Sequence, residues 1–96
     1  MSNKKQKITN RGTAHFVYIL QCADDTLYTG YAIDAKKRVI EHNTGKAAAK
    51  YTRARRPVQL VYTEECDTRS AALKREAHIK KFSRKEKLLL IQKNSR

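Results

Sequence analysis

The chain contains little cysteine, proline or glycine: two Cys, one Pro and three Gly among 96 residues, with no Trp. Cys22 and Cys66 lie far apart, and neither belongs to a C-x-x-C or to a close Cys/His pair. This excludes the ligand spacing of a structural zinc site. We expect both cysteines to be reduced and to be buried as small apolar side chains.

Long apolar runs are also missing. The longest, Phe16 to Leu20, has five residues, whereas a helix needs about 20 to span a bilayer. Residues 1–13 are polar and basic and lack the apolar stretch of a signal peptide. We therefore expect a cytoplasmic protein with no membrane partner.

Acidic residues are scarce as well. The chain has 22 Lys and Arg against 9 Asp and Glu, a formal charge of +13. The basic residues concentrate in 1–13, 36–56 and 69–96. Lys and Arg that neutralise phosphates release condensed counterions, so such a surface attracts nucleic acid. A merely solvated basic surface is the alternative.

Turn signals and apolar patterning predict the element order β-β-α-β-α-α. HFVYILQC, from residue 15, indicates a strand buried on both faces, and LYTGYA, from residue 27, indicates its hairpin partner. Asp34 predicts the start of a helix that ends before Gly45. Residues 45–56 indicate a basic loop, with a helical turn at the alanines as the alternative. Pro57 precedes a third strand, VQLVYTEE.

Two further helices complete the predicted domain. Asp67 or Thr68 caps the first, which runs to about Phe82. A capping box from Ser83 to Glu86 opens the second, KLLLIQ. The prediction is one α+β domain over residues 14–92, a small three-stranded antiparallel sheet flanked by helices, between a disordered basic tail (1–13) and a short C-terminal tail (93–96).

Five side chains are candidates for chemistry. Tyr18 and Tyr28 lie on the two hairpin strands, Arg38 and His42 lie one turn apart on one helix face, and Glu76 borders the apolar stripe of a later helix. Taken singly, each has an ordinary structural explanation: a packed tyrosine, a solvated arginine, a histidine that stabilises a helix end, a glutamate paired with a lysine one turn on.

Taken together, the sequence resembles the GIY-YIG nuclease domain. Residues 17–19 match the first family motif, and residues 28–30 match the second with Thr29 in place of the usual Ile. The helix with Arg38 and His42, and the later Glu76, match the remaining positions. The resemblance covers residues 14 to 92 and is closest to the small single-domain bacterial branch.

The resemblance implies a metal-dependent endonuclease. Glu76 would hold a single Mg²⁺ or Mn²⁺, Arg38 would hold the scissile phosphate, and Tyr18 and Tyr28 would lie beside the attacking water. The proton acceptor is either His42 or a metal-activated tyrosinate. Gly30 is expected where another group approaches the backbone closely.

Both tyrosines can serve one site only if they share a sheet face. A three-residue loop that pairs Cys22 with Thr26 places them together, and a two-residue loop that pairs Cys22 with Leu27 places them on opposite faces. The first register is therefore the one that the nuclease interpretation requires.

Binding of DNA is expected through the segment from Lys36 to Arg56 and through the C-terminal helices. Strand structure such as single strands or flaps, or a partner protein, is expected to select the target. Tyr31 or Tyr51 would stack on unpaired bases. The expected nucleic-acid contacts are Lys36, Lys37, Lys46, Lys50, Arg53, Arg55 and Arg56.

Two alternatives remain open. Many family members carry an Asn in the last helix, where this chain has Leu88 to Ile91, with Asn94 near the end. That favours a non-catalytic module that binds DNA or RNA on the same fold. A protein-interaction adaptor would be favoured only if the protein bound no nucleic acid at low salt.

Overall fold

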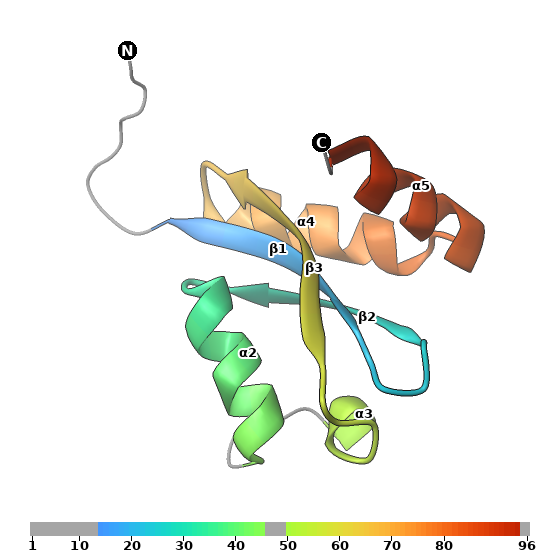
Figure 1. Cartoon of the computed structure of the whole chain (residues 1–96). Coiled ribbons are helices and arrows are strands. Elements are labelled where there is room, and N and C mark those ends of the chain that lie inside the picture. The colour runs from blue at the N-terminus through green and yellow to red at the C-terminus, as the bar shows by residue number, and fades with distance from the viewer. Residues whose placement is uncertain (1–13, 46–49, 95–96) are drawn as a thin grey trace.

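The fold is a three-stranded antiparallel sheet between two layers of helices (Figure 1). The computed structural model describes residues 14–45 and 50–94. Along the chain the elements are β1 (His15–Gln21), β2 (Leu27–Ala32), α2 (Ala35–Thr44), α3 (Lys50–Arg53), β3 (Gln59–Cys66), α4 (Arg69–Lys80) and α5 (Arg84–Asn94). The predicted α+β class and order are confirmed, with one additional short helix, α3.

The central strand is β1, because the sheet order is β2-β1-β3. Its continuous apolar stretch is buried on both faces, as predicted. Tyr18 and Leu20 pack on the face covered by α2, and Val17 and Ile19 pack on the face covered by α4 and α5 (Figure 1). The sheet therefore separates two small cores.

The hairpin has the register that the nuclease interpretation requires. Gln21 pairs with Leu27, and the amide of Cys22 donates to the carbonyl of Thr26 at 2.8 Å across the three-residue loop. Asp25 in that loop has φ 69°, a left-handed conformation that Asp tolerates in tight turns. Tyr18 and Tyr28 consequently project from the same face of the sheet.

Helix starts follow the predicted caps. Asp34 Oδ1 accepts from the amide of Lys37 at 3.0 Å. Thr68, one of the two residues proposed for the next cap, accepts from the amide of Ala71 at 3.0 Å. The last helix opens with the reciprocal capping box, in which Ser83 Oγ accepts from the amide of Glu86 and Glu86 accepts from the amide of Ser83. It extends to Asn94, beyond the predicted end.

The segment predicted as a basic loop contains α3, described from Lys50 to Arg53. The alanines of the alternative, a helical turn, lie outside the described residues. One turn is too short to be stable by propensity alone, so contacts with the rest of the fold hold the described part of α3. The predicted tail 1–13 and the contact residue Lys46 lie outside the described residues.

The cysteines are both free. Cys22 is buried as expected, whereas Cys66 is only partly buried and packs at the margin of the core beneath α4. In the part of the chain that the structure describes, no helix is long and apolar enough to cross a bilayer.

Candidate active site

The two motif tyrosines meet on the α2 side of the sheet. The ring centroids of Tyr18 and Tyr28 are 6.5 Å apart. Tyr18 lies opposite Gly30 in the ladder, and its ring crosses directly over that glycine. A Cβ on Gly30 would clash with the Tyr18 hydroxyl and would lie 2.5 Å from Cζ. The close approach expected at Gly30 is made by the tyrosine ring itself.

The imidazole of His42 links this pair to α2. Tyr18 Oη lies 3.0 Å from His42 Nε2, and Thr52 Oγ1 lies 2.7 Å from Nδ1. The ring of Tyr28 contacts the same imidazole edge-on at 5.4 Å between centroids. His42 is 0% exposed, so both ring nitrogens interact with side chains and neither faces solvent. Any proton exchange with solvent would therefore pass through one of these partners.

The guanidinium of Arg38 approaches the same phenol. It hydrogen-bonds to the Tyr18 hydroxyl, and its Nη1 donates to Glu41 Oε1 at 3.0 Å. A guanidinium carries five N–H donors, so it can hold a phosphate oxygen in a fork while keeping these contacts. The predicted geometry on one helix face, with Arg38 and His42 one turn apart, is thereby realised.

Burial sets the protonation states of this cluster. It raises the pKa of Tyr18 to about 12, an effect opposed by the hydrogen bond from Arg38. Burial, followed by the charge of Arg38, lowers the pKa of His42 below its ordinary value. At neutral pH the phenol and the imidazole are both uncharged, and Arg38 is the cation beside them.

The carboxylate of Glu76 acts on the cluster through its charge, from α4. That charge is the smallest of the named contributions to the raised pKa of Tyr18. The side chain is only 17% exposed, and Oε2 lies 3.1 Å from Lys80 Nζ. The structural alternative for Glu76, an ion pair one turn along the helix, is therefore present in this structure.

The residues fit a divalent ion that takes one protein ligand. Within residues 14–45 and 50–94 there is no group of three or more His, Cys, Asp or Glu side chains that could hold a metal. Mg²⁺ needs only one or two carboxylates, because it keeps several waters and also binds substrate phosphate. Glu76 supplies one such carboxylate, and Lys80 would compete with the ion for it.

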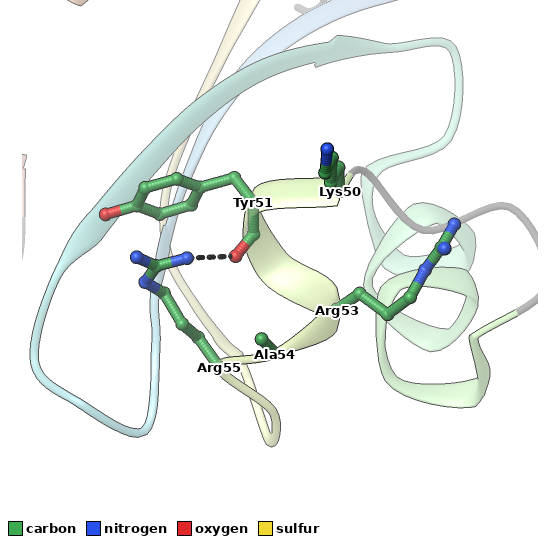
Figure 2. A pocket seen from close by; sticks show the side chains of 5 residues that line it. All are labelled: Lys50, Tyr51, Arg53, Ala54 and Arg55. Atoms are coloured by element: carbon green, nitrogen blue, oxygen red, sulfur yellow. Dashed lines mark hydrogen bonds between the residues drawn. The ribbon is translucent and has the colours of Figure 1, made fainter.

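The sequence did not predict that side chains of α3 and the residues after it pack against the site. Tyr51 stacks on Tyr28 with centroids 5.9 Å apart, and the guanidinium of Arg55 lies 4.0 Å over the Tyr51 ring. Figure 2 shows the hydrogen bond from Arg55 to the carbonyl of Tyr51, at 2.8 Å. Arg55 also donates to Asp24 in the hairpin loop at 3.0 Å. These contacts join α3 to the candidate site. The contacts of Tyr51 with Tyr28 and of Arg55 with Asp24 connect residues distant in sequence, so no local motif marks them.

The basic residues divide into two groups. Arg55 is bound as described, and Arg56 donates to the carbonyls of Arg53 and Asn43 at 2.9 and 3.4 Å. Both arginines are partly buried. By contrast, the expected nucleic-acid contacts with exposed side chains are Lys36, Lys37, Lys50 and Arg53.

The two tyrosines considered as base-stacking platforms already have partners. Arg55 covers one face of Tyr51. The hydroxyl of Tyr31 lies 2.8 Å from His15 Nδ1, and these two rings stack at 6.0 Å. The guanidinium of Arg69 lies 5.9 Å from the Tyr31 ring. An unpaired base would have to displace these groups to stack there.

The last helix ends at Asn94. Asn94 lies beside β3, in a shallow depression that it lines with residues 60–63. Leu90 and Ile91 pack on the core beneath α4, while Leu88 and Leu89 are exposed. The family position for the Asn is therefore occupied by residues that pack or face solvent.

Comparisons with known proteins identify the family of the chain. The family model described as the GIY-YIG catalytic domain matches residues 14–89. A UPF0213 protein of Syntrophus aciditrophicus is 59% identical over 80 residues, which covers 83% of this chain and 92% of that protein. A UPF0213 protein of Staphylococcus saprophyticus is 62% identical over 77 residues, covering 80% and 93%.

Two solved structures share the fold. The solution NMR structure of a UPF0213 protein from Bacillus halodurans has a TM-score of 0.55 at 41% identity and covers 84% of this chain and 85% of its own. That of an E. faecalis protein has a TM-score of 0.58 at 40% identity, covering 85% and 86%. The chain thus belongs to the GIY-YIG domain family, a nuclease family that acts on nucleic acid, and is related within it to the UPF0213 proteins.

Proposed function

We propose that this protein is a divalent-metal-dependent endonuclease that hydrolyses DNA phosphodiesters and selects its substrate by strand structure. The observation that carries the proposal is the 3.0 Å contact between Tyr18 Oη and His42 Nε2, with Arg38 hydrogen-bonded to the same phenol. This arrangement puts a proton acceptor, a hydroxyl and a phosphate-binding cation at one point.

The position and exposure of each residue determine its role in hydrolysis. Arg38 holds the scissile phosphate with its planar fork. Tyr28 is half-buried at the margin of the cluster and helps to position the attacking water. Because His42 is enclosed, it receives a proton through Tyr18: as water passes a proton to the phenol oxygen, the phenol hydrogen passes to Nε2.

The step balances in protons and bonds. The hydroxide forms a new P–O bond, one ester P–O bond breaks, and the leaving oxygen takes a proton from solvent. His42 then returns its proton to solvent through Tyr18. When bound, the metal would supply charge stabilisation at the phosphate and the leaving oxygen, and Glu76 would hold it.

Selection by strand structure follows from the kind of contact available. The exposed residues Lys36, Lys37, Lys50 and Arg53 suit phosphate contacts, which carry no sequence information directly. We propose single-stranded or branched DNA as the substrate, because its backbone can bend into a small site at the sheet face. A partner protein that directs the enzyme to such DNA is compatible with this role.

The test is cleavage of end-labelled single-stranded, flapped and duplex DNA in Mg²⁺, in Mn²⁺ and in EDTA. Wild type is compared with Glu76→Gln, and Glu65→Gln is the matched control because Glu65 is an exposed carboxylate on β3. We expect cleavage that requires the metal and Glu76 but not Glu65. Equal cleavage by wild type and Glu76→Gln would contradict the proposed ligand.

A second candidate is a module that binds nucleic acid without cutting it. Leu88 to Ile91 stand where the family resemblance expects an Asn, and Asn94 lies beside β3, which favours it. Salt-sensitive binding is expected under both proposals and does not separate them. DNA or RNA binding by wild type and by Glu76→Gln, with no metal-dependent cleavage by either, would favour the binding module.

A further inference from the structure

Thr52 lies behind the imidazole of His42, on the side away from Tyr18. It is 0% exposed, and its Oγ1 lies 2.7 Å from Nδ1. It stands in the middle of α3, a helix of four residues. Tyr18, His42 and Thr52 therefore form one buried chain of hydrogen bonds contributed by β1, α2 and α3.

The direction of these bonds follows from the donors available. Arg38 can only donate, so the Tyr18 oxygen accepts from it. A phenol has one hydrogen, and pointing it at His42 Nε2 gives both that hydrogen and the ring nitrogen a partner. If Nε2 carried the proton instead, the phenol oxygen would accept twice and its own hydrogen would be left without that partner, which is costly in the interior. The favoured imidazole has its hydrogen on Nδ1, donated to Thr52 Oγ1.

We propose that Thr52 is a positioning residue that holds His42 in the Nδ1–H tautomer, with Nε2 unprotonated and aimed at the Tyr18 hydroxyl. This rests on the proposed function, because it gives Thr52 a part in the same proton transfer. When Nε2 takes the phenol hydrogen, the imidazole becomes a cation with two N–H donors. Thr52 then accepts from one donor and the Tyr18 oxygen from the other.

Among the groups around His42, Thr52 is the one placed to hold the Nδ1–H tautomer. Tyr18 faces it from β1 and Tyr28 faces it edge-on from β2. Arg38 and Glu41 act on it through their charges from its own helix. Thr52 is the neutral partner at Nδ1, so it orients the ring without attracting the proton as a carboxylate would.

The position of Thr52 is fixed by the rest of α3. Arg55, three residues on, donates to Asp24, and its carbonyl accepts from the amide of Ala23 at 2.9 Å. The amide of Arg55 donates to the carbonyl of Thr52 at 2.9 Å. The hairpin loop thereby anchors the turn that presents the threonine to His42.

The direct test reads the tautomer by long-range ¹H–¹⁵N NMR of the histidine rings at pH 8, where an unperturbed histidine is neutral. The chain has three histidines, and His42→Asn assigns the signals of His42. In wild type we expect a protonated Nδ1 and an unprotonated Nε2. Thr52→Val removes the hydroxyl at nearly constant shape and should shift His42 toward the Nε2–H form, whereas Thr52→Ser should keep the wild-type pattern.

Thr63→Val, an exposed threonine on β3, is the matched control and should change nothing. A wild-type signal with the hydrogen on Nε2, or a Thr52→Val signal equal to wild type, would overturn the proposal. If Thr52→Val does not fold, the wild-type tautomer and the Thr52→Ser pattern still decide it.

Kinetics give the second readout. We expect Thr52→Val to lower kcat about 10- to 100-fold, the range found when groups that orient functional histidines are lost, with KM nearly unchanged and with Thr52→Ser close to wild type. An unchanged kcat in Thr52→Val would overturn the role of Thr52 in proton transfer. If wild type cuts nothing, the endonuclease proposal fails by itself, and the NMR experiment still tests the tautomer.

Discussion

The ring of Tyr18 lies directly over the α-carbon of Gly30, its partner across the β1–β2 ladder. Because β2 is an edge strand, a ring that crosses it carries its hydroxyl toward the margin of the sheet. There the phenol meets His42 from α2. The glycine of the second motif thus makes room for the tyrosine of the first.

Substitution of Gly30 should disturb the site through this ring. Gly30→Ala adds a Cβ that would lie 2.5 Å from Tyr18 Cζ and 3.0 Å from Cε1, so the ring must move. Overpacking of this kind costs about 1–3 kcal/mol. We expect a loss of that size in the free energy of unfolding, measured by urea denaturation, and loss of cleavage in the variant that remains folded.

The control for this prediction removes the Tyr18 ring. In a Tyr18→Leu background the atoms that would clash with the new Cβ are gone, so Gly30→Ala should cost clearly less there. Equal costs in both backgrounds would show that the glycine is needed for backbone reasons unrelated to Tyr18.

The exposed basic residues and those bound within the fold should give different defects when they are substituted: weaker phosphate binding for the first group and lower stability for the second. Lys50→Gln and Arg53→Gln remove exposed cations. The plot of log K against log salt has a negative slope. If each residue makes one contact with a single-stranded phosphate, each substitution should reduce the magnitude of that slope by about 0.7. Arg55→Gln should leave the slope nearly unchanged and should instead lower stability by about 1 kcal/mol, because it removes a partly exposed ion pair and the contact with the Tyr51 carbonyl.

Asp24→Asn is the matched control for Arg55. It breaks the same ion pair but leaves the arginine in place. If Arg55 is structural, Asn at position 24 should weaken stability without reducing the salt dependence of binding. A steeper salt dependence of nucleic-acid binding in Asp24→Asn than in wild type would show instead that the released Arg55 reaches phosphate.

The buried imidazole makes stability depend on pH. The folded-state pKa of His42 is lowered, chiefly by burial, so the unfolded chain binds more protons between that pKa and about 6.5. Its contribution is fully present above about pH 6.5 and is lost as pH falls through this window. One proton corresponds to at most about 1.4 kcal/mol per pH unit.

Urea unfolding of wild type and His42→Asn at several values between pH 5 and pH 8 measures this effect. We expect wild type to lose more stability than the variant on acidification, although the variant is less stable throughout. Parallel curves would contradict the neutral, buried state of the ring. His15→Asn is the control for the loss of a half-buried histidine outside the cluster.

Local patterns were sufficient to predict the strands and the helix caps. They left the hairpin register open between two loops, and the observed pairing of Gln21 with Leu27 is the one in which Tyr28 shares a sheet face with Tyr18. The caps depend only on neighbours, so Asp34 and Ser83 were recognisable from a few residues.

Long-range contacts explain what the sequence did not predict. The helix α3 is held by Arg55 to Asp24, 31 residues away, and Thr52 meets His42 across ten residues. Neither contact leaves a period or a spacing in the sequence. Thr52 and Tyr51 therefore lay in a segment that resembled a basic loop, and Arg55 resembled one more phosphate-binding cation.

The final prediction concerns how α4 is fixed beside the site. Arg75, the residue before Glu76, has its Nε 3.0 and 3.1 Å from the two carboxylate oxygens of Glu64 on β3. The hydroxyl of Tyr62 donates to the same carboxylate at 2.6 Å. The side chains of Arg75 and Glu64 are 33% and 28% exposed, so this pair is better shielded than an ordinary surface pair.

Breaking one side of this pair should cost more than removing both. Arg75→Leu leaves Glu64 partly buried without its cation, and Glu64→Gln leaves Arg75 without its anion. We expect a double-mutant cycle, measured by urea unfolding, to give a coupling of about 1 kcal/mol, at the upper end for partly exposed pairs. A coupling near zero would mean that α4 is fixed by its apolar face alone, through Ala72 and Ile79, and that the position of Glu76 does not depend on Arg75.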